Sequence, residues 1–306
     1  MEKEQVRENK IIDKELYKHF VDKLYEKKQL KCFVEYNELF DLINQMRDLN
    51  KYNLNDFEEK SEIYEIFELL MLSWGLFSFA TAGLQKHGET KMIFFSLSTQ
   101  IANNLSSIMH LTLKGLNYQV GIISRAMYEI VLLLPVLLIE EKKREKYFES
   151  AKKLNSNKIW NDEFKFSQLN ECLVKYEEKI TKGKELKFLR KIRSKQYSSY
   201  SEYTHNSFLR SFVDSYTRKT YKNNKDDTLQ FNLWGASNVK AEINFSNICS
   251  LMIYISYILQ NIFSSDNKFY IDEIKDEQSR EHWNQANYLL IIFREIYLYK
   301  FYNIDN

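Results

Sequence analysis

Two short polar stretches place side chains that can bind phosphate or move protons inside segments that otherwise look like helix core. The first contains Arg125 and Glu129, which are four residues apart and therefore lie on one face of a helix, one turn from each other. The second, here called the polar ladder, carries a polar residue at every fourth position: Arg193, Tyr197, Ser201 and His205. Because a buried Arg, Glu or His is costly unless it is paired, this placement predicts one shared polar site.

The residue types define the chemistry of such a site. His205 can act as a general acid and base near neutral pH. Arg125 and Arg193 can bind an anion, while Glu129 can orient an arginine or the histidine. A second interpretation stays open, in which the same residues form a buried network that only fixes how the helices pack.

Two predicted helices position these groups. A helix over 118–141 carries Arg125 and Glu129, and a helix over 184–206 carries the polar ladder. Leu186 and Leu189 precede the ladder on the same helix face, which indicates that this face is turned towards the core. Because inward polar groups must find partners, we predict that the two helices lie against each other.

The second helix also begins in a basic region. Residues 140–227 carry 22 Lys and Arg against 14 Asp and Glu, and 182–195 carry seven against one. Four lysines fall on a stripe away from the ladder, which predicts a solvent-facing nucleic-acid-binding surface with Tyr200 close enough to stack on bases. A simple solvated face and an anionic membrane surface are the alternatives. The four lysines are Lys184, Lys187, Lys191 and Lys195.

Composition predicts an all-α fold. The 306-residue chain is 44% hydrophobic and 15% aromatic, too apolar for disorder, and one proline and seven glycines are too few for an all-β protein. We predict a single multi-helix bundle of long antiparallel helices over 1–306 with no substantial β-sheet. N-terminal helices are expected in 1–88, a core bundle with the candidate site in 90–210, and C-terminal helices in 229–306.

The helices of this bundle are delimited by capping and turn signals. Gly115 to Asn117 predicts a tight connection, and Lys219 to Thr228 a loop. Helices are expected at about 11–49 (one or two), 56–87, 92–114, 118–141, 142–154, 167–181, 184–206, 239–264 and 271–302.

Several functional classes have no support in the sequence. There is no HExxH, no Cys/His cluster, no P-loop, no GxGxxG and no GxSxG, so we predict neither a metal site nor a bound cofactor. Three widely separated cysteines give no disulfide framework and are typical of reduced thiols in the cytosol.

The apolar segments are judged too short or too polar to cross a membrane. Met92 to Leu113 has 22 residues without a formal charge, but ten of them are Ser, Thr, Asn, Gln or His. Leu69 to Leu84 has 16 residues, and Leu132 to Ile139 is shorter still. We therefore predict no membrane insertion and a cytoplasmic protein. RNA or another acidic molecule, a second copy of the chain, or a protein from the same operon are the expected partners.

The two polar stretches resemble a bacterial helical family known only as domain of unknown function 5677. Gly121 to Glu129, with Arg125, Tyr128 and Glu129, looks like the "Arg, two residues, aromatic, Glu" signature of that family. Tyr197 to His205 is similar to its "Tyr, spacer, Ser, spacer, His" signature, and Trp160 lies between the two. The resemblance covers roughly residues 90–210. It implies an all-α fold but no established activity.

A more remote similarity is to the HEPN superfamily, whose helical bundles include metal-independent ribonucleases of toxin and antiphage systems. That signature has an Arg and a His with four to six residues between them, whereas Arg193 precedes His205 by twelve positions. The resemblance implies a nucleic-acid-acting protein, with a metal-independent ribonuclease effector of bacterial stress or antiphage defence as one form. A non-catalytic helical scaffold or sensor, with a structural network or a small anionic ligand, is the alternative.

Overall fold

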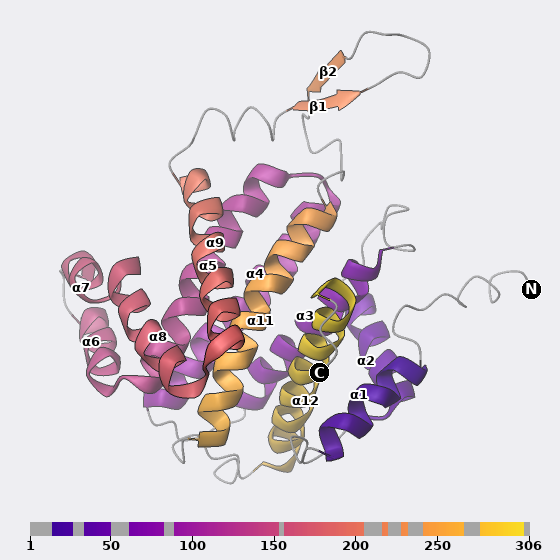
Figure 1. The fold of residues 1–306 in the computed structure, drawn as a ribbon, viewed down its shortest axis with the longest axis horizontal. Coiled ribbons are helices and arrows are strands. Elements are labelled where there is room, and N and C mark those ends of the chain that lie inside the picture. The colour runs from indigo at the N-terminus through magenta and orange to yellow at the C-terminus, as the bar shows by residue number, and fades with distance from the viewer. Residues whose placement is uncertain are drawn as a thin grey trace, which may run out of the picture. The chain divides into compact units, whose positions relative to one another are not determined.

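The computed structural model describes residues 14–26, 34–49, 61–82, 89–152, 156–204, 216–219, 228–231, 241–265 and 276–302. The chain divides into two compact units, residues 1–84 with 271–306 (unit 1) and residues 85–270 (unit 2). Both units are built from helices, which confirms the predicted all-α fold (Figure 1). The predicted single domain stays a prediction, and the helices expected together in 229–306 are divided between the two units.

Unit 1 is organised by one antiparallel pair of long helices. Its helices are α1 (Lys14–Glu26), α2 (Tyr36–Leu49), α3 (Glu62–Ala82) and α12 (Glu277–Tyr302). The Ser73 hydroxyl of α3 donates a hydrogen bond to the carbonyl oxygen of Ala286 in α12 (2.9 Å). The Lys300 ammonium lies 3.9 Å from Glu62, which places the end of α12 beside the start of α3.

Unit 2 is built around α5 (Asn117–Ile139), which contacts α4, α6, α8, α9 and α11. Every residue from Val131 to Leu138 is buried, because neighbouring helices surround this part of α5. The other elements are α4 (Glu89–Leu113), α6 (Glu141–Lys152), α7 (Ser156–Glu163), α8 (Phe166–Ile180), α9 (Gly183–Thr204), α11 (Ala241–Ser265), β1 (Tyr216–Lys219) and β2 (Thr228–Phe231).

Specific hydrogen bonds close the end of α4 and the end of α5. At the end of α4, Gly115 adopts a positive φ of 70°, and the amides of Gly115 and Leu116 donate to the carbonyls of Thr112 and Leu111 (2.9 and 2.8 Å). This arrangement is a Schellman motif, and it confirms the predicted tight connection between α4 and α5. After α5, the buried Arg144 guanidinium donates to the terminal carbonyls of α5, those of Leu137 and Leu138 (2.9 and 3.3 Å).

The remaining predicted boundaries agree with the structure to within a few residues, with two differences. Helix α7 was not expected, and β1 and β2 pair antiparallel on either side of the predicted 219–228 loop. The inner part of that loop and the expected helix end near His87 lie outside the described residues.

The prediction of no membrane insertion and of a cytoplasmic location is wrong. By length and composition, three helical segments among the described residues can cross a membrane: Glu62–Ala80 (19 residues), Asn117–Ile139 (23 residues) and Ala241–Ser264 (24 residues). In this part of the chain the prediction measured only the run from Leu132 to Ile139, whereas the helix that contains this run begins at Asn117. The arrangement of the helices alone gives no support to the partners predicted with it, which were RNA or another acidic molecule, a second copy of the chain, or a protein from the same operon.

Gly183 provides a local test of this architecture. It begins α9 with φ +63°, and a Cβ added there would meet no atom within 4 Å, so a substitution acts only through backbone strain. We expect Gly183→Ala to lower the free energy of unfolding by about 1 kcal/mol. Gly183→Asn should cost less, because Asn tolerates the left-handed region better. Denaturant titration measures both, and equal stability of the two variants and wild type would contradict the assigned conformation.

Candidate functional site

Arg125 and Glu129 form the predicted pair on one face of α5. The Nε and Nη2 atoms of Arg125 lie 3.0 and 2.9 Å from the same carboxylate oxygen, Oε1 of Glu129. The Arg125 side chain is 14% exposed and that of Glu129 is 47% exposed. The pair therefore lies at the edge of the core, with the carboxylate on the solvent side.

Aromatic rings hold the Arg125 guanidinium between α5 and α9. Its Cζ atom lies 5.0 Å from the ring centroid of Tyr197 and 5.7 Å from that of Tyr128, both within the range of cation–π attraction. Tyr197 stacks on Phe166 at the start of α8, with ring centroids 3.7 Å apart. The structure thus brings Arg125, Glu129 and Tyr197 together, as predicted from their spacing.

Arg193, by contrast, is engaged by a residue that the sequence analysis did not identify. Its Nε and Nη2 atoms donate to the two carboxylate oxygens of Glu177 in α8 (2.7 and 3.0 Å). The hydroxyl of Tyr254 in α11 donates to Oε1 of Glu177 (2.8 Å), and all three side chains are buried. We call Arg193, Glu177 and Tyr254 the buried network. The Tyr128 hydroxyl of α5 joins it by donating to the Arg193 carbonyl oxygen (2.9 Å).

The electrostatics of the buried network favour a charged arginine. Burial by itself lowers the pKa of Arg193, but the hydrogen bonds to Glu177 and the surrounding charges outweigh it and raise that pKa above its ordinary value. The charge is then cancelled by a carboxylate with no exposure to solvent. Arg193 is therefore neutralised within the core rather than presented to a ligand.

The partnership between α5 and α9 is confirmed, but the predicted pairing of their polar groups is only partly right. Arg193 was expected to meet the α5 groups, whereas its carboxylate comes from a third helix. A signal for Glu177 was present in the sequence, because Leu169, Leu173 and Glu177 are spaced by four and share one face of α8. A carboxylate in line with two buried leucines indicates a buried ion pair.

The last two residues of the polar ladder, Ser201 and His205, lie wholly or partly outside the described residues. Ser201 belongs to the last turn of α9, but its side chain is outside the part of the chain that is described. His205, the proposed acid and base, also lies outside the described residues. Their roles stay predictions. Among the described residues, no three His, Cys, Asp or Glu side chains are grouped to hold a metal ion.

The basic stretch divides into paired and unpaired charges. Arg193 pairs with Glu177, and the Arg190 guanidinium donates to Glu178 at the surface. Four lysines of α9 remain exposed, as predicted, and we call them the lysine row: Lys184, Lys187, Lys191 and Lys195. The predicted role of Tyr200 in stacking on bases is wrong, because its side chain is 4% exposed and packs beside the Tyr128 ring.

Comparisons of this chain with models of protein families, with curated proteins and with solved structures found no significant match. The resemblance to domain of unknown function 5677 and the more remote similarity to the HEPN superfamily therefore stay predictions. The geometry itself defines a helical unit with an internal ion pair, an arginine at its edge and a basic surface helix.

Glu177 and Glu178 are adjacent in sequence but opposite in environment, and they form a matched test of the buried network. Glu177→Gln leaves Arg193 buried without a counter-charge, so we expect a loss of about 3–5 kcal/mol in the free energy of unfolding. Glu178→Gln removes an exposed pair and should change that free energy by less than about 1 kcal/mol. Chemical denaturation measures both. If Glu177→Gln lowered the free energy of unfolding as little as Glu178→Gln, the buried network would not stabilise unit 2.

Proposed function

We propose that this protein is a non-catalytic helical sensor or scaffold that holds a small anionic ligand at Arg125. The observation that carries the proposal is the unequal use of the two arginines. Arg193 is neutralised by Glu177, which fits a structural role. Arg125 keeps its Nη1 atom buried and without an acceptor among the described residues. A buried guanidinium donor without an acceptor is costly, and an oxyanion would satisfy it.

Two features prepare Arg125 for an oxyanion. The rings of Tyr128 and Tyr197 fix the guanidinium plane, so that binding requires little reordering of the side chain. The competing carboxylate of Glu129 is nearly half exposed and can move into solvent when a ligand replaces it. A phosphate or carboxylate that accepts from Nη1 and Nη2 together would satisfy the buried donor, and a bidentate pair is the geometry that arginine favours.

Substitutions on either side of the pair test the ligand site, with inorganic phosphate as the probe. Arg125→Gln should abolish saturable phosphate binding measured by calorimetry or NMR titration. Glu129→Gln removes a competing anion worth up to about 1 kcal/mol, and phosphate affinity should rise by about two- to fivefold. Lys175→Gln, which removes the cation of the exposed ion pair with Glu171 in α8, is the control and should change nothing. Phosphate binding that survives Arg125→Gln would contradict the proposal.

The second candidate is a HEPN-like nucleic-acid-acting protein, in the form of a metal-independent ribonuclease effector of bacterial stress or antiphage defence. The observation that favours it is the lysine row, which lies exposed on the same helix as Arg193, Tyr197 and Ser201 of the polar ladder. Here Arg125 would bind a phosphate of the substrate and His205 would transfer the proton. Both candidates use Arg125, and they differ in whether any bond is broken.

Cleavage assays in EDTA separate the two candidates. If the protein is a ribonuclease, His205→Ala and Arg125→Ala should both abolish RNA cleavage while changing the melting temperature by only a few degrees. His282→Ala, which alters a histidine of unit 1, should keep full activity. Undiminished cleavage by folded His205→Ala would end the catalytic role of His205. A wild-type protein that cleaves no RNA favours the sensor or scaffold.

A further inference from the structure

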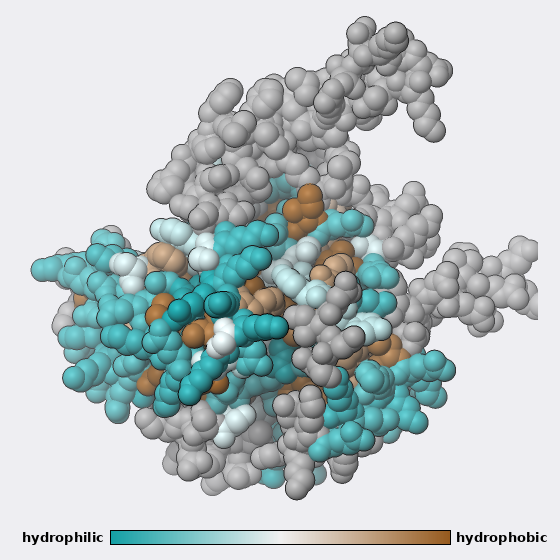
Figure 2. All heavy atoms as spheres, in the orientation of Figure 1, coloured by the Kyte–Doolittle hydropathy of each residue, from teal (hydrophilic) through white to brown (hydrophobic). Residues whose placement is uncertain are grey.

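The lysine row is a straight line of charge along α9. Its members are spaced by three, four and four residues, which places them on one face of the helix. At 1.5 Å per residue the row is about 16 Å long, with neighbouring lysines about 4.5–6 Å apart along the axis. Figure 2 shows a mostly hydrophilic surface where Figure 1 draws α9.

The charge of the row is not compensated by neighbouring acidic side chains. Glu177 is buried with Arg193, and Glu178 accepts a hydrogen bond from Arg190. Glu185 accepts hydrogen bonds from the hydroxyls of Thr181 (2.7 Å) and Tyr257 (3.1 Å). Among the described residues no ion pair joins an acidic side chain to the row. The row therefore presents four unpaired positive charges to an acidic partner.

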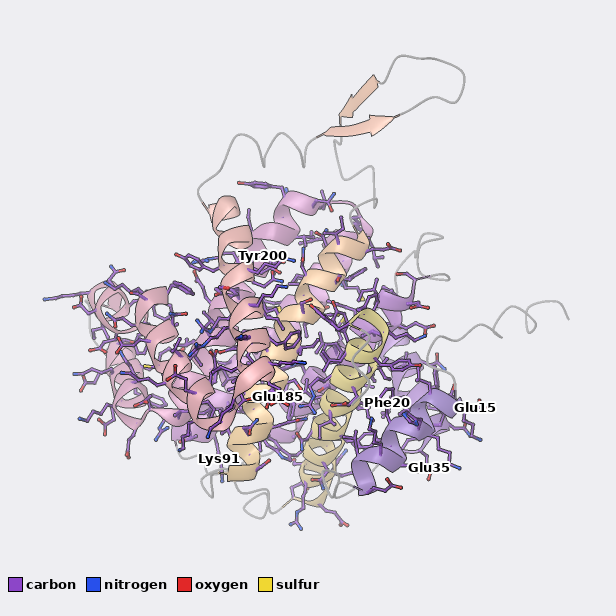
Figure 3. All side chains as sticks on the ribbon, viewed as in Figure 1. Glu15, Phe20, Glu35, Lys91, Glu185 and Tyr200 are labelled. Carbon is purple, nitrogen blue, oxygen red and sulfur yellow. The ribbon has the colours of Figure 1, made fainter. Side chains whose placement is uncertain are left out.

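None of the described aromatic rings of α9 is exposed beside the row, although Phe188, next to Lys187, is only half-buried. Tyr200 is buried against Tyr128, and Tyr197 is occupied by Phe166 and Arg125. Figure 3 labels Tyr200 near one end of α9 and Glu185 near the other. Single-strand binders combine positive charge with such stacking rings, whereas a duplex keeps its bases inside and presents phosphates.

We propose that the lysine row binds the sugar–phosphate backbone of double-stranded nucleic acid and does so without reading its bases. This inference rests on the nucleic-acid partner of the second candidate function but not on cleavage. A lipid surface fits less well, because stable binding of a basic helix to lipid also needs apolar side chains that insert. Leu189 and Ile192 of α9 are instead 1% and 6% exposed, and Leu186 and Phe188 are half-buried.

The salt dependence of binding provides the first test, by fluorescence anisotropy with unrelated RNA and DNA duplexes of roughly 20 base pairs. Four phosphate contacts give a slope of log K against log salt of about −3.6, equivalent to a fall of about 150-fold between about 50 and 200 mM salt. Affinity should not depend on duplex sequence, and the matching single strands should bind more weakly. A single strand that binds as tightly as its duplex would overturn the proposal, as would binding that is insensitive to salt.

Charge reversal provides the second test. Changing all four lysines of the row to Glu should weaken duplex binding by more than about 100-fold, whereas changing all four to Arg should preserve it. The control changes four other exposed lysines of unit 2 to Glu and should alter affinity only severalfold: Lys142, Lys146, Lys158 and Lys165. Circular dichroism checks that each variant is folded.

The outcomes separate this proposal from the functions above. Equal losses in the row variant and the control would show a non-specific charge effect and contradict the proposal. Binding of phosphatidylserine vesicles without binding of duplexes would assign the row to a membrane surface. Duplex binding without cleavage would contradict only the ribonuclease, and phosphate binding at Arg125 is measured independently of both.

Discussion

The buried ion pair between Arg193 and Glu177 is the constraint on which the rest of unit 2 depends. Removing two charges from water costs several kcal/mol, and only good geometry with further hydrogen bonds repays that cost. Here the guanidinium donates from two of its nitrogens, Nε and Nη2, and the Tyr254 hydroxyl donates to the same carboxylate, so α8, α9 and α11 are joined at one point. The Arg193 carbonyl oxygen, bonded to Tyr128, adds α5 to the same point.

This pair also determines which face of α9 meets solvent. Lys191 and Lys195 are each two positions from Arg193, which is about 200° around the helix. Once Arg193 points to Glu177, those lysines must point outwards. The inward arginine is neutralised and the outward lysines are not, although all belong to one stretch of basic sequence. The net charge of the sequence stretch is therefore larger than the positive charge that α9 presents to solvent. The angular position of each residue around the helix shows which of the charges a partner can contact.

The spacing of residues along the sequence predicted contacts within one helix and turns between neighbouring helices. It could not predict which residues pair between helices that are distant in the sequence. The Arg125–Glu129 pair follows from a separation of four on a helix, and the Gly115 turn follows from the residue type. Glu177 lies sixteen residues from Arg193 on a different helix, and no periodicity identifies which arginine it meets. Tyr200 is seven positions from Arg193 and so shares its inward face. Its burial could therefore have been derived from the same period that placed the lysines.

A ladder along one helix is also too long to form one small site. Arg193 and Ser201 are eight residues apart, about 12 Å along the axis, so they cannot both contact one phosphate-sized anion. A compact site must instead be completed by a helix that crosses the ladder. Arg125 of α5 lies beside Tyr197, the second residue of the ladder, whereas Arg193 binds Glu177. Among the described residues, the small-anion site that we propose is thus centred on Arg125 and Tyr197 rather than on Arg193.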